Sequence, residues 1–155
     1  MADRAILTAL IDQAARELNV AARQLASQTG QDRHARAQLA MLRDYRADYM
    51  RRLEQAGQRG MTGMNYANFT LFIATLDGAI VQQNNTLAQL QNNMAACRQQ
   101  WHGRRRRLKA LEILAARETL DRAQRQNRQE QRACDECASA LHYRRLQQPY
   151  LQARP

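Results

Sequence analysis

The stretch Gly57-Gln58-Arg59-Gly60-Met61-Thr62-Gly63-Met64-Asn65 decides the fold of this chain. It places three glycines within seven residues, and a cluster of this kind ends one helix and separates it from the next. Asparagine is a residue type that caps helix N-termini, so Asn65 is expected to open a second helix. The sequence therefore predicts two helices joined by a short turn over residues 58–64.

The segment before the turn carries apolar residues at alternating spacings of four and three, which is typical of a coiled-coil seam. Gln28, Asp32 and Arg46 interrupt this series, and polar seam residues help to fix the register of a helix pair. The seam positions are Leu7, Ile11, Ala14, Leu18, Ala21, Leu25, Gln28, Asp32, Ala35, Leu39, Leu42, Arg46, Tyr49 and Leu53.

The segment after the turn repeats the same spacing. Its β-branched and aromatic residues between positions 69 and 81 are common in strands, but steps of three and four decide for a helix. The positions are Phe69, Ile73, Leu76, Ile80, Gln83, Leu87, Leu90, Met94, Cys97, Trp101, Arg104, Leu108 and Leu111.

A short connection forces the two helices to run antiparallel, with position i opposite about position 122 − i. Leu53 is then level with Phe69, and Leu7 with Ala115. The second helix continues past its partner, so residues 116–145 form an overhang. The prediction is an all-α fold: a long antiparallel two-helix coiled coil, or helical hairpin, with a C-terminal helical overhang.

The predicted hairpin is one domain over residues 1–146, with helices over 3–57 and 65–145. Residues 147–155, which contain both prolines of the chain, are expected to be a flexible tail. The most apolar run, residues 69–81, is too short to cross a bilayer and contains Asp77. The N-terminus lacks the pattern of a cleaved signal, so a cytoplasmic protein without direct membrane insertion is expected.

Charge is unevenly distributed along this chain, which has a net charge of +10. Residues 98–132 hold eleven basic and four acidic groups, and a basic block of this kind predicts an acidic partner. Nucleic acid is one alternative, but Trp101 lies on the seam and offers no stacking platform. A solvated face is another alternative, and an acidic protein surface is favoured. The densest part is Arg104, Arg105, Arg106, Arg107 and Lys109.

Catalytic residues, cofactors and metal ligands are not indicated. Asp44 and Asp48 lie on an open helix face, where useful pKa shifts are not expected, and a two-helix hairpin has no enclosed pocket. Cys134 and Cys137 could supply half of a zinc site with His142 nearby, but a single pair without a second half is a weak signal. Small spacers on a thin seam explain the pair better.

A second stripe adjoins the seam near the turn, in a region almost free of charge. Excess apolar surface with tyrosines is typical of a protein-docking site. The alternative is that a wider seam packs Tyr45 and Phe72 within the hairpin or against another copy. The stripe consists of Gln38, Leu42, Tyr45, Tyr49, Phe72, Leu76, Ala79 and Gln83.

Four blocks of the sequence resemble the FliJ family of flagellar export proteins, in the order found there. They are Gln38-Leu39-Ala40-Met41-Leu42-Arg43-Asp44-Tyr45-Arg46-Ala47-Asp48-Tyr49, then Asn65-Tyr66-Ala67-Asn68-Phe69 with Phe72, Leu76, Ala79 and Gln83, then Cys97-Arg98-Gln99-Gln100-Trp101 with Arg107-Leu108-Lys109, and finally Gln131-Arg132 with Asp135-Glu136.

The resemblance implies a non-enzymatic stalk protein of the type III export apparatus, at the cytoplasmic face of the cell membrane. Its implied partners are the hexameric export ATPase FliI, the export gate protein FlhA and export chaperones. It assigns the eight-residue stripe to the gate and, more loosely, the stretch Arg104–Arg107 with Lys109 to the ATPase. Injectisome stalk proteins share this architecture, so a virulence export system is an alternative.

Overall fold

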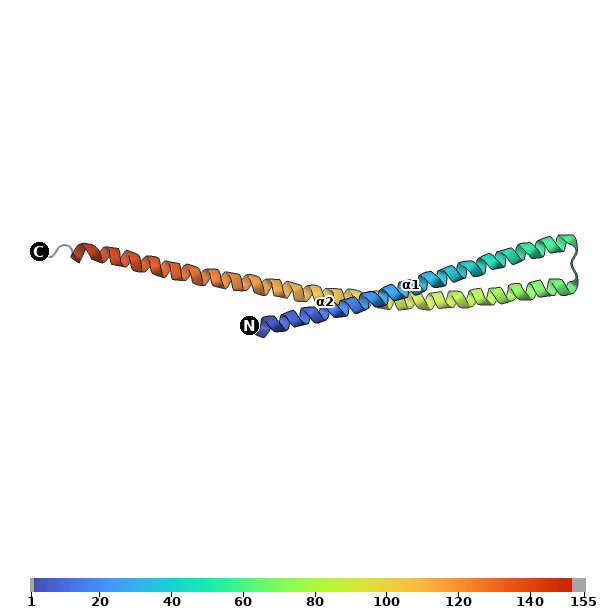
Figure 1. Cartoon of the computed structure of the whole chain (residues 1–155), viewed down its shortest axis with the longest axis horizontal. Helices are drawn as coiled ribbons and strands as arrows, with labels where there is room; N and C mark the ends of the chain where they lie inside the picture. The colour runs from blue at the N-terminus through green and yellow to red at the C-terminus, as the bar shows by residue number, and fades with distance from the viewer. Residues whose placement is uncertain (1, 152–155) are drawn as a thin grey trace. The chain divides into compact units, whose positions relative to one another are not determined.

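The computed structural model describes the backbone of residues 2–151 and the side chains of residues 4–147. This part of the chain forms two helices, α1 (Ala2–Arg59) and α2 (Gly63–Leu151), and contains no strand. A three-residue turn joins the helices, which run antiparallel from it (Figure 1). The predicted all-α helical hairpin is therefore confirmed.

The turn depends on one glycine and one threonine. Gly60 has a φ of 89°, a left-handed conformation in which a Cβ atom would be strained, and its N–H donates to the Gly57 carbonyl at 3.3 Å. The Thr62 Oγ1 atom accepts a hydrogen bond from the Asn65 N–H at 3.3 Å. Thr62 thus caps α2. The expectation that Asn65 is the cap is wrong, and α2 begins two residues earlier, at Gly63.

Both helices extend beyond the bounds expected from the sequence. Helix α1 reaches Arg59, where residue 57 was expected as the last, because a glycine at a helix C-terminus does not stop the helix until a left-handed residue is reached. Helix α2 continues over residues 147–151, the first part of the expected flexible tail. Residues 152–155, the rest of that tail, lie outside the described residues.

The chain divides into two units. The hairpin unit is residues 12–108, and the terminal unit is Met1–Ile11 with Lys109–Pro155. The hairpin unit has a thin core, because alanines fill much of it and each buries little area. Its buried apolar residues all come from the predicted seams: Ala14, Ala21, Ala35, Leu39, Ile73, Leu76 and Leu87.

The register of the hairpin unit agrees with the predicted pairing to within about one helical turn. Tyr49 packs against Phe69 and Phe72, with ring centroids 6.2 and 4.3 Å away. Gln83 Nε2 donates to the carbonyl oxygen of Ala35 at 2.9 Å. These contacts match the expectation that position i faces about position 122 − i.

In the described part of the terminal unit, the two helices pack against each other only near Leu7, Ile11 and Ala115. Leu7 and Ile11 of α1 are half-buried and line a shallow pocket with Ala115 of α2, the level predicted for Leu7. From Thr119 to Gln147 every side chain is exposed. This is the predicted helical overhang.

Neither helix, over the residues searched, has a stretch both long and apolar enough to span a bilayer.

Candidate functional site

The eight-residue stripe predicted beside the turn, here called the turn-proximal stripe, is assembled from both helices of the hairpin unit. Gln83 Nε2 of α2 donates to Gln38 Oε1 of α1 at 3.1 Å. The rings of Tyr49 and Phe72 meet at 4.3 Å and 41° between planes, a tilted aromatic pair. The structure therefore brings residues 38–49 and 72–83 to one region.

Members of the stripe lie at three depths. Leu76 is 8% exposed and belongs to the core, while Leu42, Tyr49, Ala79 and Gln83 are half-buried. Tyr45 is 54% exposed, Phe72 is 41% exposed, and Gln38 is also exposed. Phe72 packs partly within the hairpin, as the wider-seam alternative holds, whereas Tyr45 remains open to a partner.

Sequence reasoning missed Met41 as a neighbour of Tyr45. Met41 is 57% exposed and lines a groove on α1 with Tyr45 and Asp44. The spacing of four residues between Met41 and Tyr45 places both on one face and could have revealed the pair. Methionine adapts its shape readily, so Met41 widens the apolar surface around Tyr45.

An ion pair crosses between the helices beside the stripe. Arg46 Nε donates to Asp77 Oδ1, so the one charge of residues 61–97 is matched by the arginine that interrupts the first seam. This hydrogen bond, with the charge of Asp77, raises the pKa of Arg46. Both side chains are more than 40% exposed, so the pair orients the helices more than it stabilises them.

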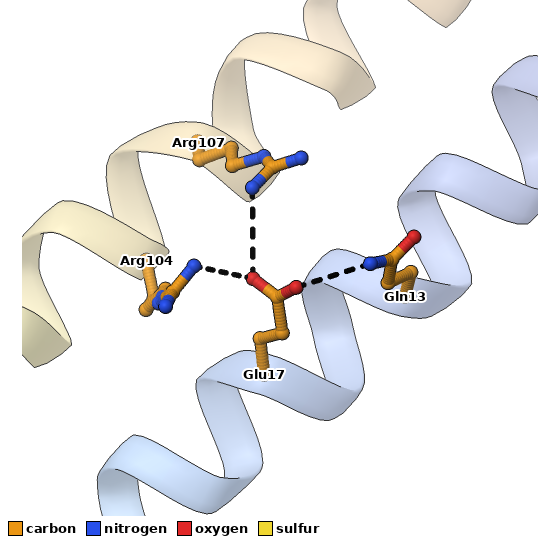
Figure 2. Close-up of polar contacts among 4 residues, drawn as sticks. All are labelled: Gln13, Glu17, Arg104 and Arg107. Atoms are coloured by element: carbon orange, nitrogen blue, oxygen red, sulfur yellow. Dashed lines mark hydrogen bonds and ion pairs between the residues drawn. The ribbon is translucent and has the colours of Figure 1, made fainter.

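Arg104 and Arg107 of the predicted basic stretch converge on Glu17 of α1 (Figure 2). The Arg104 Nη1 atom lies 2.5 Å from Glu17 Oε2, and the Arg107 Nη1 atom lies 3.6 Å from the same oxygen. Gln13 Nε2 donates to the other carboxylate oxygen of Glu17 at 3.2 Å. Arg104 is exposed, so the prediction that it lies in the seam is wrong. Its charge remains in water and pairs with Glu17 at the edge of the helix interface.

Glu17 is a residue that sequence reasoning missed. The predicted register places it opposite position 105, which was sufficient to suggest a contact with the basic stretch. The remaining members of the stretch lie elsewhere. The Arg105 guanidinium stacks over the Trp101 ring, 5.3 Å from its centroid, Arg106 is exposed, and Lys109 belongs to the terminal unit.

The three cysteines remain free thiols. Cys97 is half-buried, whereas Cys134 and Cys137 are exposed on α2. No group of three or more His, Cys, Asp or Glu side chains that could hold a metal ion occurs among the described residues. The arrangement of the two surfaces suits contacts with other macromolecules: one is rich in aromatic side chains, and the other holds exposed arginines.

Comparison with known proteins gives both a family and a fold. A structure of a YscO homolog from Chlamydia trachomatis has a TM-score of 0.60 over 99% of this chain and 96% of that chain. Its sequence identity is 15%, so this likeness concerns the fold alone.

Two curated relatives, the flagellar FliJ proteins of Escherichia coli (strain K12) and Salmonella typhi, are each 31% identical over 145 residues. The match covers 94% of this chain and 99% of each relative. The family profile described as "Flagellar FliJ protein" matches residues 4–147. The resemblance noted in four sequence blocks thus extends over nearly the whole chain, which belongs to the FliJ family.

Proposed function

We propose that this chain is a non-enzymatic component of the flagellar type III protein export apparatus. In this role it couples the export ATPase, the FliI hexamer, to the export gate protein FlhA, and it assists export chaperones. It works in the cytoplasm, peripheral to the cytoplasmic face of the cell membrane. The observation that carries the proposal is membership of the FliJ family over residues 4–147.

The chemistry of the two surfaces supports separate partners. The turn-proximal stripe contains no charged residue of its own and offers aromatic and amide groups; Asp44 lies beside Tyr45, and Asp77 is paired with Arg46. Such a surface suits an uncharged hydrophobic patch of a protein like FlhA. The basic stretch offers exposed arginines, which suit an acidic surface such as the rim of an ATPase ring.

The class of partner is tested by capturing bound proteins from the native bacterium with the tagged full-length chain. A flagellar export ATPase or the gate protein FlhA among the captured species supports the proposal. Capture of an injectisome ATPase in their place assigns the chain to a virulence export system. Recovery of nucleic acid alone, without any export protein, contradicts both assignments.

The gate contact is tested most cleanly at Tyr45. Tyr45→Ala removes an exposed ring, so we expect binding to purified FlhA to weaken by about tenfold or more while the melting temperature stays unchanged. Tyr49→Ala is less informative, because Tyr49 packs against Phe69 and Phe72. Leu71→Ala is the control, since Leu71 is 69% exposed and outside the stripe. Equal FlhA binding by Tyr45→Ala and the unaltered chain contradicts the gate assignment.

The ATPase contact is tested by reversing charge at Arg105 and Arg106. We expect the double change to glutamate to reduce stimulation of FliI, with the loss greatest at low salt because exposed charges are screened by ions. Arg43→Glu with Arg51→Glu is the matched control, since both arginines are exposed and lie elsewhere on α1. Equal stimulation by the test and control variants removes the basic stretch from the ATPase contact.

A further inference from the structure

A groove beside Trp101 is lined by residues that belong to neither of the two surfaces described above. It lies between α1 and α2 within the hairpin unit and has a volume of about 450 Å³. Most of its wall is apolar or small. Its lining includes Ala22, Leu25, Ala26, Gly30 and Arg33 of α1 and Trp101 of α2.

The floor of this Trp101 groove is formed by small residues that recur every fourth position: Ala22, Ala26 and Gly30. A Cβ atom built on Gly30 would meet nothing within 4 Å, so packing inside the hairpin does not require a glycine here. Glycine inside a helix costs about 1 kcal/mol relative to alanine. Gly30 therefore leaves the α1 backbone open to close approach from outside the hairpin.

The charges at the groove are positive and lack partners within the described chain. Arg33 lines the groove, and Arg105 lies over the Trp101 ring with its guanidinium carbon 5.3 Å from the ring centroid. Neither forms an ion pair with another described side chain. Asp32, the neighbour of Arg33 in sequence, is already engaged by Arg36 at 2.8 Å, and Glu17 is engaged by Arg104.

We propose that the Trp101 groove binds an amphipathic helix of a partner protein. Its apolar side chains would lie on the small-residue floor against the indole, and its flanking carboxylates would pair with Arg33 and Arg105. Small residues allow two helices to approach closely, and helices recognise such grooves through apolar anchors at spacings of three and four. Unpaired arginines at both helices supply the complementary charge.

The lining favours an acidic protein helix over nucleic acid. Proteins that bind single-stranded nucleic acid combine a basic groove that tracks the backbone with exposed rings on which bases stack. The Trp101 ring is half-buried and already stacked with Arg105, and the groove floor offers only methyl groups and glycine backbone. Apolar side chains suit that floor better than bases or sugars do.

The fluorescence of Trp101, the single tryptophan of the chain, provides a direct reading of the groove. The probe is a synthetic helical peptide of about 18 residues, with leucines at i, i+3, i+4 and i+7 and glutamates on both flanks, free of aromatic residues. When this peptide is added to the full-length chain, we expect the Trp101 emission to shift and the shift to reach a plateau as the peptide concentration rises. Two control peptides, with the leucines changed to glutamine or the glutamates changed to lysine, should give no saturable shift.

Variants of the chain distinguish binding in the groove from attraction of the peptide to the positive charge of the whole protein. Gly30→Leu fills the floor, and its Cβ atom would meet nothing within 4 Å, so we expect the variant to weaken peptide binding by about tenfold or more. Arg33→Glu should have an effect of similar size. Gly78→Leu is the matched control, because Gly78 is also an open glycine inside a helix but lies away from the groove; this variant should bind the peptide normally.

Two outcomes would overturn the inference. Normal binding by Gly30→Leu would show that the peptide does not enter the groove. A shift by polyglutamate or by an oligothymidylate strand as large as that by the peptide would show a surface for any polyanion. The FlhA contact is read separately, because Tyr45→Ala leaves the groove intact and should bind the peptide normally even where gate binding is lost. The FliI contact is read separately with Gly30→Leu, which keeps Arg105 and Arg106 and should stimulate FliI normally even where peptide binding is lost.

Discussion

Glu17 shows how one residue can reduce the positive charge that a partner meets. Its carboxylate contacts Arg104 and Arg107, two of the four consecutive arginines on α2, and accepts a further hydrogen bond from Gln13. Its side chain is 28% exposed, whereas those of Arg104 and Arg107 are 47% and 50% exposed. A pair at this depth is worth about 1 kcal/mol or less, so an acidic partner can displace it.

Glu17→Gln should therefore strengthen binding to an anionic surface. Glu17→Gln and the control Glu54→Gln each raise the net charge by one unit, but only Glu17→Gln also frees Arg104 and Arg107. The Glu17→Gln variant should therefore elute from a cation exchanger at a higher salt concentration than the control. Glu54 is exposed and forms no ion pair among the described side chains. The melting temperatures of both variants should stay close to that of the unaltered chain. Elution of the two variants at the same salt concentration would show that Glu17 does not mask the arginines.

At the scale of the elements, the turn is set by backbone conformation. Gly60 has a positive φ, whereas Gly57 lies within the last turn of α1, where a helical conformation suits alanine better than glycine. An added Cβ meets no atom within 4 Å at either position, so the backbone alone decides the outcome.

The two glycines of the turn should respond to alanine with opposite signs. We expect Gly60→Ala to lower the free energy of unfolding by about 1 kcal/mol, because the left-handed conformation strains any residue with a Cβ atom. Gly57→Ala should raise it by about 0.5 to 1 kcal/mol through helix propensity. Urea unfolding followed by circular dichroism measures both. A stabilising Gly60→Ala would mean that the turn adopts another conformation in solution.

The seam of the helix pair contains a weak point formed by two polar residues of α1. Gln28 Oε1 and Asp32 Oδ1 are buried and have no hydrogen-bond partner among the described residues. An unsatisfied buried acceptor costs about 1–3 kcal/mol. The next turns of the seam are apolar, with Ala35, Leu39 and Leu87 forming a buried cluster.

Replacing the unsatisfied amide with a hydrocarbon should stabilise the hairpin. We expect Gln28→Leu to raise the free energy of unfolding by about 1 kcal/mol, since it removes a buried acceptor and adds apolar burial. Gln91→Leu, at an exposed position of α2, is the control and should leave the value within about 0.5 kcal/mol. Equal urea midpoints for the two variants would contradict the role given to Gln28.

At the scale of the whole molecule, the two units differ in what their side chains contribute to stability. The hairpin unit holds all the buried residues of the described chain. The terminal unit leaves Leu120 and Leu141, at 64% and 63% exposure, without cover among the described residues. Burial, not helix length, determines cooperative stability, so the overhang contributes little to it.

A chain that ends after Glu118 should therefore unfold at nearly the same temperature as the full chain. The truncation removes residues whose described side chains are all exposed, so no packing is lost from the hairpin unit. Thermal unfolding followed by circular dichroism gives the comparison, with the helical signal per residue as a control for folding. A large fall in melting temperature would show that the overhang packs against something in solution.

Several features of the candidate site were predictable from local patterns, whereas others were not. The heptad spacing placed Leu76 and Leu87 in the core, and the short turn fixed the antiparallel register that brings Tyr49 to Phe72. The register places Glu17 level with the basic stretch, but it does not say which arginines Glu17 contacts, because a residue that flanks a seam has several neighbours within reach. Thr62 was missed as the cap, since Thr62 and Asn65 are both capping types and only the backbone distinguishes them.

The sequence by itself determined two helices, their direction, their register and their family, because heptad spacing and a glycine turn are local features that leave one way to bury both seams. Only the tertiary structure decided which side chains face a partner. It turned Tyr45 outward while Tyr49 packed inward, divided the arginines between Glu17 and Trp101, and left a groove above Gly30. These outcomes depend on side-chain rotamers and depths at the edge of the helix interface, where side chains from both helices compete for the same space and spacing along one helix does not decide which of them is buried.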